Sequence, residues 1–281
     1  MGVPEVPEMR VIKILISAVL AFFISGCAPL PNRASSQNKD VPAFSRAATD
    51  LKKIQLSLSP ETMRLIRSDP AYIKAAFDQV KNELKLRLGA KFSILNDADL
   101  FIVFSSIVSY LLAPYGHSTA TELSELLKEP RLDCDQYALA VGHLCKYNKG
   151  VSDTWIEIIG WYGGFIGDHA QIFSSNPHSG VKLLLDPTVG IAALADFDHV
   201  ASGKRISRDD MIDFSSRSEM GDEREKIIRA LADGEYKPSD LYYYFEDVDS
   251  MIRVTKNIQQ RNWPPDYVTP GALKFRRGYK K

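Results

Sequence analysis

The first half of the chain beyond its N-terminal segment has apolar residues at helical spacing. Residues 44–58 have leucine and isoleucine positions compatible with one helix face, and Ser59-Pro-Glu-Thr62 is a helix start signal. Residues 72–88 repeat the helical spacing. Residues 100–112 are apolar on most sides but well short of the roughly 20 residues that span a bilayer, so we expect a buried helix. Residues 45–112 are therefore predicted to form a helical front half.

The pattern becomes strand-like in the middle of the chain. Residues 154–160 are β-branched and aromatic, and Trp161-Tyr-Gly-Gly164 is expected to form a turn. Residues 168–173 alternate between two faces, and residues 181–186 form a third apolar strand, stopped by a proline. A helix followed by an antiparallel meander indicates the α+β class.

A run of good helix formers begins after residue 133. Asp133 followed by Gln136 is typical of an N-cap with a capping box, which makes Cys134 the first helical residue. The backbone N–H groups and the helix dipole at that position favour a thiolate, the nucleophilic form of cysteine. Asp133 and Asp135 oppose this effect, so a reactive Cys134 needs a basic partner. The alternative is a small buried cysteine that packs the helix end.

Cys145 is a poor disulfide partner for Cys134. On one helix, their 11-residue separation places the Cα atoms about 16 Å apart, whereas a disulfide needs about 7 Å. We expect Cys145 to fill the core.

Two polar residues lie where neighbouring strands of the meander start and end. His169 is near the start of one strand and Asp186 ends the next, so an antiparallel hairpin can make them neighbours. Asp168 would point to the other face of its strand. The other histidines are expected on the helix of Cys134 (His143) or in polar loops (His117, His178 and His199).

The C-terminal part has a different pattern. Beyond residue 200 no further strand is predicted. Residues 222–233 form a short amphipathic helix that ends at Gly234.

Composition and charge limit the class of protein. The 281 residues include 35 Lys and Arg, 35 Asp and Glu and three Cys. The balanced charge gives no reason to expect a nucleic acid as partner. An apolar fraction of 45% with 25% charged residues excludes a disordered tail and a polytopic membrane protein. Three cysteines cannot form a disulfide scaffold.

The N-terminal residues resemble a bacterial lipoprotein signal. Apolar residues 14–24 have the length of a signal-peptide core. Ile24-Ser-Gly-Cys27 resembles the lipobox, in which the cysteine is acylated and becomes the mature N-terminus. The resemblance implies a lipid anchor at Cys27 in the bacterial cell envelope, and Ala28 favours the outer membrane, facing the periplasm. An ordinary signal peptide or a short anchor helix is the alternative.

These signals suggest an organisation of the whole chain. Translation starts at Met1 or at Met9, which gives a cleaner signal peptide. The predicted parts are a signal peptide (1–26), a flexible tether rich in Pro, Ser and Asn (27–44), a domain with the helical front half (45–205) and a C-terminal extension (206–281).

Three motifs resemble the transglutaminase-like superfamily, a branch of the papain-like cysteine enzymes. They are Cys134 in Asp-Cys-Asp-Gln-Tyr-Ala, His169 followed by Ala, and Asp186 in Leu-Leu-Leu-Asp-Pro-Thr. Their order and their separations of 35 and 17 residues suit the family. The acidic residues around Cys134 are similar to those of bacterial transglutaminase-like cysteine proteinases. Over residues 95–200 the resemblance implies a papain-like core, with the cysteine helix packed on an antiparallel sheet.

The chain departs from the family pattern at Asp133, where many members have Gly, at Gln171, where many have an aromatic residue, and at Pro187, where some proteinases have Asn. The ten residues before Cys134 contain no Gln or Trp that could be an oxyanion donor. The candidates left in the approaching loop are Tyr115 and His117.

The resemblance implies a lipid-anchored cysteine hydrolase, a peptidase or amidase, that acts on a protein or peptide at the cell envelope without a cofactor or metal. Cys134 would be the nucleophile, His169 the base, and Asp186 the group that orients the imidazole. Attack on the thioester by an amine instead of water would make the protein a crosslinking transglutaminase. A catalytically inactive binding or assembly module is the alternative of another class. Zinc binding by the same residues lacks the close paired spacing typical of zinc sites.

Overall fold

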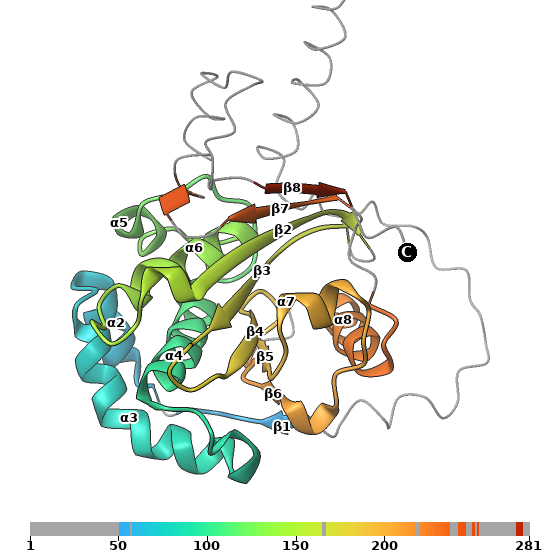
Figure 1. Ribbon diagram of the computed structural model, residues 1–281. Helices are drawn as coiled ribbons and strands as arrows, with labels where there is room; N and C mark the ends of the chain where they lie inside the picture. Colours follow the sequence, from blue (N-terminus) through green and yellow to red (C-terminus); the bar gives the residue numbers. More distant parts are fainter. Residues whose placement is uncertain are drawn as a thin grey trace, which may run out of the picture.

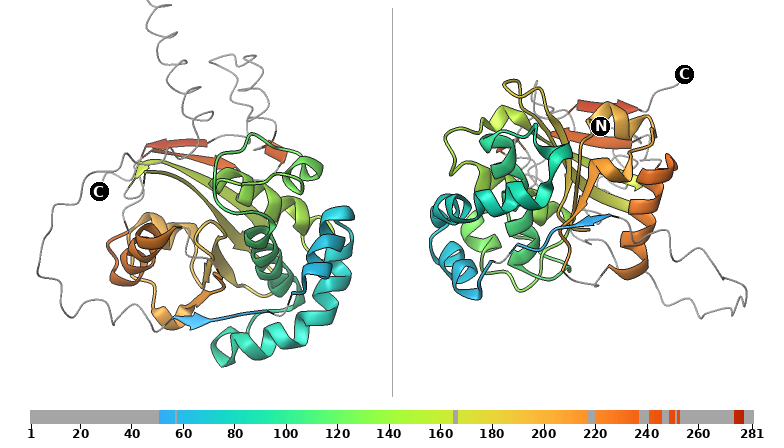
Figure 2. Two further views of the ribbon diagram at one scale, coloured as in Figure 1. Left: turned by 180° about the vertical axis from the view of Figure 1, so that it is seen from behind. Right: turned by 90° about the horizontal axis from the view of Figure 1, so that it is seen from below.

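The described part of the chain folds into an eight-stranded mixed sheet with helices on both faces (Figures 1 and 2). The computed structural model describes residues 51–56, 58–164, 167–216, 220–236, 241–245, 249–250, 252 and 274–277. The predicted signal peptide, Cys27 and the tether lie outside these residues. The strand order is β1-β6-β5-β4-β3-β2-β7-β8. This architecture confirms the α+β class.

The helices of the front half agree with the sequence pattern. They are α2 (Pro60–Ser68), α3 (Tyr72–Leu88) and α4 (Asp97–Leu112). The side chain of Ser59 accepts a hydrogen bond from the backbone N–H of Thr62, so the predicted start signal is the N-cap of α2. Nearly all residues of α4 are buried, as its apolar pattern predicts. Among the described helices, none combines the length and the apolar character that crossing a membrane requires.

The helix predicted over residues 44–58 is wrong where the structure describes it. Lys52–Lys53 form strand β1, which pairs in parallel with β6 (Met211–Asp213). The backbone N–H of Ile54 donates to the carbonyl oxygen of Asp213 at 2.6 Å. The hydrogen-bond partners are about 160 residues away in sequence, so local periodicity could not reveal them.

The middle of the chain forms the predicted helix and meander. After the short α5 (Leu123–Leu126), α6 (Cys134–Cys145) packs against β2 (Ile156–Gly164) and β3 (Gly167–Ser175). Strands β3, β4 (Lys182–Asp186) and β5 (Ile191–Ala193) continue the antiparallel order. The turn predicted at residues 161–164 is wrong, because β2 continues through a register shift to Gly164, which pairs with Gly167. Trp and Tyr favour strands, and the two glycines tolerate the irregular backbone at the shift.

The C-terminal part supplies strands that the sequence pattern did not predict. After α7 (Phe197–Ala201), β6 lies between β5 and β1, and α8 (Gly221–Asp233) follows it. Strand β7 (Leu241–Phe245) pairs with β2, and β8 (Lys274–Arg277) pairs with β7. The predicted loss of strand character beyond residue 200 is therefore wrong. The remaining short elements are 3-10 helices at Ala90–Phe92, Asp153–Trp155 and Arg208–Asp210.

The sheet separates two apolar cores. Ile172 and Leu185 lie in the core formed with α2–α6, whereas their neighbours Phe173 and Leu184 lie in the core that contains α8. Figure 2, seen from below, shows the front helices and α8 on opposite sides of the strands. Because successive strand residues point to opposite faces, the sequence position of a strand residue decides which layer it contacts.

Candidate functional site

Cys134 is the first residue of α6, as the N-cap motif predicts. The side chain of Asp133 accepts a hydrogen bond from the backbone N–H of Gln136. Cys134 is only 6% exposed, and its Sγ lies 3.9 Å from Oδ1 of Asp135. The thiol therefore lies at the positive end of the helix dipole, which favours the thiolate, and also beside the carboxylate of Asp135, which disfavours it.

His169 and Asp186 form a buried hydrogen-bonded pair. Nε2 of His169 lies 2.7 Å from Oδ2 of Asp186, and the two residues are 5% and 0% exposed. Because a carboxylate only accepts hydrogen bonds, Nε2 is the nitrogen that carries the proton. The side chain of Gln171, two residues along β3 from His169, donates to the same Oδ2 at 3.0 Å. The predicted proximity of His169 and Asp186 is confirmed.

The chain after β4 holds the second oxygen of Asp186. Its Oδ1 accepts the backbone N–H of Val189 at 3.3 Å, and its backbone carbonyl accepts the N–H of Gly190 at 2.9 Å. Gly190 has a φ of 74°, and a Cβ there would come within 2.7 Å of the side chain of Ser215. The turn that orients the Asp186 carboxylate therefore requires glycine at this position.

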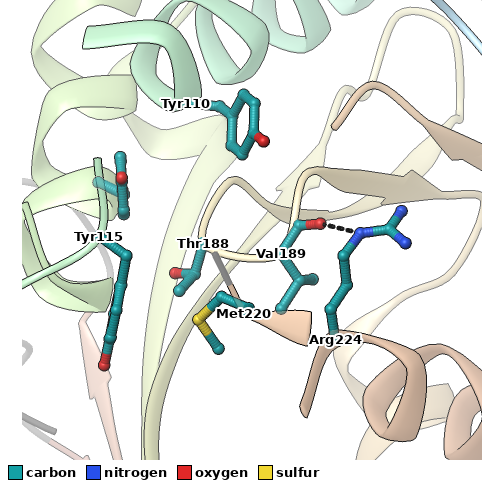
Figure 3. Close-up of a pocket in the computed structure, with 7 residues that line it drawn as sticks. Tyr110, Tyr115, Thr188, Val189, Met220 and Arg224 are labelled. Atoms are coloured by element: carbon teal, nitrogen blue, oxygen red, sulfur yellow. Dashed lines mark hydrogen bonds between the residues drawn. The ribbon is translucent and has the colours of Figure 1, made fainter. Parts of the chain in front are cut away.

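Arg224 on α8 holds the same turn from outside. Its Nε donates to the carbonyl oxygen of Val189 at 2.9 Å, and its Nη2 lies 2.7 Å from Oδ1 of Asp213 (Figure 3 shows the first contact). The peptide that donates to Asp186 is thus fixed by an arginine on α8. Sequence reasoning missed Arg224, because nothing distinguishes it from other polar residues of an amphipathic helix.

The sheet alternation places the histidine-aspartate pair and Cys134 in different layers. His169 shares a face of β3 with Phe173, and Asp186 shares a face of β4 with Leu184, so both point toward the layer of α8. Cys134 belongs to the core on the other face. Two of the three predicted residues are in direct contact with each other, and Cys134 packs in the core on the other face of the sheet.

The two layers meet at a small pocket at one end of the sheet (Figure 3). Tyr137, one helical turn after Cys134, lines this pocket together with Thr188 and Val189, which closely follow Asp186. The N-terminus of α6 and the C-terminal end of β4 therefore lie at the same end of the sheet. Cys134 and the pair can be parts of one site only at this end.

The loop candidates for the oxyanion donor lie beside the N-terminus of α6. Tyr115 forms an isolated β-bridge with Leu132 and lines the pocket, and its neighbour His117 is exposed, with Nδ1 3.8 Å from Oδ2 of Asp133. His117 therefore contacts the carboxylate that caps α6.

The other cysteine and histidines have structural surroundings. Cys145 is buried in the core as predicted, and burial raises the pKa of its thiol to about 12. Of the two described cysteines, neither forms a disulfide.

Nε2 of His143 lies 3.0 Å from the carbonyl oxygen of Thr121. His178 is exposed in a turn, whereas His199 lies on α7 and not in a loop.

Within the described residues, no group of three or more His, Cys, Asp or Glu side chains is arranged to hold a metal ion. The geometry therefore gives no support to the zinc alternative.

Comparisons with known protein families, with curated proteins and with solved structures find no match to this chain.

Proposed function

We propose that the protein is a cysteine hydrolase, a peptidase or amidase, with a transglutaminase-like core formed by α6 and β2–β4. The observation that supports the proposal is the buried 2.7 Å contact between His169 and Asp186, at the same end of the sheet as the helix N-terminus that carries Cys134. A buried carboxylate that orients an imidazole near a cysteine is the arrangement of nucleophilic acyl-transfer sites.

In the proposed reaction, Nδ1 of His169 takes the proton of the Cys134 thiol, while Nε2 keeps its hydrogen bond to Asp186. The sulfur then attacks the acyl carbon, and the backbone N–H of Cys134 stabilises the oxyanion. His169 returns the proton to the leaving amine, which departs and leaves a thioester. Water, activated by His169, hydrolyses the thioester and restores the thiol. The positive charge on His169 offsets Asp133 and Asp135 beside the sulfur.

The position of Cys134 sets a geometric requirement for this reaction. The thiol at the N-terminus of α6 and the imidazole on β3 must meet at the end of the sheet, beyond β4. The pocket lined by Tyr137 and Thr188 lies at this end of the sheet.

We further propose that Cys27 carries the lipid and that the substrate is a protein or peptide at the cell envelope. Metabolic labelling with palmitate tests the anchor, with Cys27→Ser as the control. An unlabelled wild-type protein would exclude it.

The second candidate is a catalytically inactive module, which burial favours. Cys134, His169 and Asp186 are 6%, 5% and 0% exposed, whereas a nucleophile must meet its substrate. In this candidate the histidine-aspartate pair only stabilises the sheet.

Alkylation kinetics separate the two candidates. Iodoacetamide is added to the native full-length protein near neutral pH, and site-resolved mass spectrometry follows each cysteine. We expect Cys134 to react on the order of tenfold faster than in His169→Ala, because the imidazole stabilises the thiolate. Cys145, with its pKa of about 12, serves as the internal reference and should stay unmodified until the protein unfolds. Equal rates at Cys134 with and without His169 would favour the inactive module.

A further inference from the structure

The pocket at the end of the sheet is walled by both layers. Tyr110, Tyr115 and Tyr137 line it from the layer of α4 and α6, and Thr188, Met220 and Arg224 line it from the opposite side. Figure 3 shows the Thr188 side chain in the middle of the pocket, between Tyr115 on one side and Arg224 on the other.

The pocket is lined by residues that are close in sequence to two of the proposed reacting groups. Thr188 lies two residues after Asp186, and Tyr137 lies three residues after Cys134, which is one turn of α6. A group bound here would therefore lie at the end of the sheet where α6 begins and β4 ends.

Thr188 has a polar atom that the fold leaves unsatisfied. The residue is 4% exposed, and among the described residues its Oγ1 has no hydrogen-bond partner. A buried hydroxyl without a partner costs free energy, and such groups in native proteins call for a water or a ligand. The orphan hydroxyl faces the pocket (Figure 3).

The other polar groups of the pocket walls are already engaged. The hydroxyl of Tyr137 donates to the carbonyl oxygen of Ala113 at 2.6 Å, and the hydroxyl of Tyr110 accepts the backbone N–H of Ser216 at 3.1 Å. The charge of Arg224 is balanced by its contact with Asp213. A charged ligand group would find no compensating partner among these residues, so the pocket favours an uncharged group.

The space between the walls is small. It has room for about one water-sized group, which excludes a branched or aromatic side chain. The terminal hydroxyl of a short, uncharged side chain can take the place of such a water-sized group and hydrogen-bond to Thr188. Among amino-acid side chains, serine carries a hydroxyl on the shortest unbranched stem.

We propose that this pocket is a specificity subsite of the acyl-transfer site, which selects a serine side chain next to the acyl carbon through a hydrogen bond to Thr188. The inference rests on the proposed function and adds a substrate class to it.

Acyloxymethyl ketone probes that differ only in one residue test the subsite on the full-length protein. Cys134 displaces the carboxylate of the probe, so a C–S bond forms at the methylene carbon, the C–O bond breaks, and the thiol proton passes to His169. The probes carry serine, alanine, leucine or aspartate. We expect the serine probe to label Cys134 on the order of two- to tenfold faster than the alanine probe, the gain typical of one added hydrogen bond. The leucine and aspartate probes should be slower than both.

Variants of the hydroxyl give the decisive comparison. Thr188→Val, which keeps the shape, should bring the serine-to-alanine rate ratio to about one, and Thr188→Ser should retain the preference. Thr154→Val, at an exposed threonine outside the pocket, is the matched control and should keep the wild-type ratio. A wild-type ratio of one, or a preference that survives in Thr188→Val, would overturn the subsite.

The same samples separate a failure of the subsite from a failure of the proposed function. If iodoacetamide labelling of Cys134 depends on His169 but the probes show no serine preference, only the subsite is wrong. If labelling does not depend on His169, the proposed function fails first.

Discussion

At the residue scale, Asp186 is the most constrained group of the candidate site. Its two carboxylate oxygens accept hydrogen bonds from His169, Gln171 and the backbone of Val189, in a fully buried position. A buried carboxylate is tolerated only when its hydrogen bonds are satisfied, so this network fixes the orientation of the imidazole. The side-chain amide of Gln171, two residues along β3 from His169, takes part in this network.

His143 makes a pH-dependent contribution to stability that is separate from the site. Burial lowers its pKa from the ordinary value of 6.5, so the folded protein disfavours the charged form. The contribution is therefore complete above pH 6.5 and is lost as the pH falls below that value toward the lowered pKa.

We expect His143→Gln to lose less stability than the wild type between neutral pH and about pH 5. The glutamine amide can still donate to Thr121, but it does not titrate. Urea unfolding at both pH values measures the difference. Parallel losses in the two proteins would contradict the assigned cause.

At the scale of elements, α8 supports the turn after β4. The guanidinium of Arg224 donates to the carbonyl oxygen of Val189 and contacts Asp213 at the same time. A lysine ammonium cannot reproduce this geometry. We expect Arg224→Lys to lower the free energy of unfolding by roughly 1–3 kcal/mol. The alkylation rate of Cys134 should also fall, toward the rate measured in an Asp186→Asn variant. The reason is that Arg224 no longer fixes the turn that holds the Asp186 carboxylate.

Arg64→Lys is the control, since Arg64 pairs with Glu61 on the exposed surface of α2 and should change neither quantity measurably. Wild-type stability and wild-type alkylation in Arg224→Lys would show that α8 does not position the turn.

Much of the helical layer and the meander could be predicted from the sequence. Ser59 and Asp133 are N-caps, and α3 ends at Leu88, before Gly89. Alternation along β3 and β4 placed His169 beside Asp186. These signals involve residues that are close in sequence, so they can be recognised from one sequence alone.

The missed elements depend on distant partners. Strands β1 and β6 have two and three residues, too few for a period to be visible, and their hydrogen bonds join opposite parts of the chain. Arg224 gains its role only when α8 packs beside the turn after β4. That Cys134 packs in one core while the pair lies on the strand faces of the other likewise follows from tertiary packing, not from the motifs.

At the scale of the whole molecule, the residues beyond 205 complete the second core. Ile227, Ile228 and Leu231 of α8 are buried against the face that carries His169 and Asp186. We expect a chain ended at residue 205 to lose cooperative unfolding, because that face and the edge of β5 become exposed.

A chain ended at residue 252 is the matched control. It keeps β6, α8 and β7, and of the described elements it removes only the outermost strand β8, so we expect cooperative unfolding in urea, followed by circular dichroism. A cooperative transition in the shorter chain would mean that the second core is dispensable.

The proposed function requires Cys134 to form an acyl-enzyme with the help of His169. It is tested most directly with p-nitrophenyl acetate, a generic acyl donor, by following nitrophenolate release and the acyl group on each peptide. We expect a burst of about one equivalent with the acetyl group on Cys134, lost in Cys134→Ala and slowed on the order of a hundredfold or more in His169→Ala. Acylation that is absent from Cys134, or that proceeds equally without His169, would contradict it.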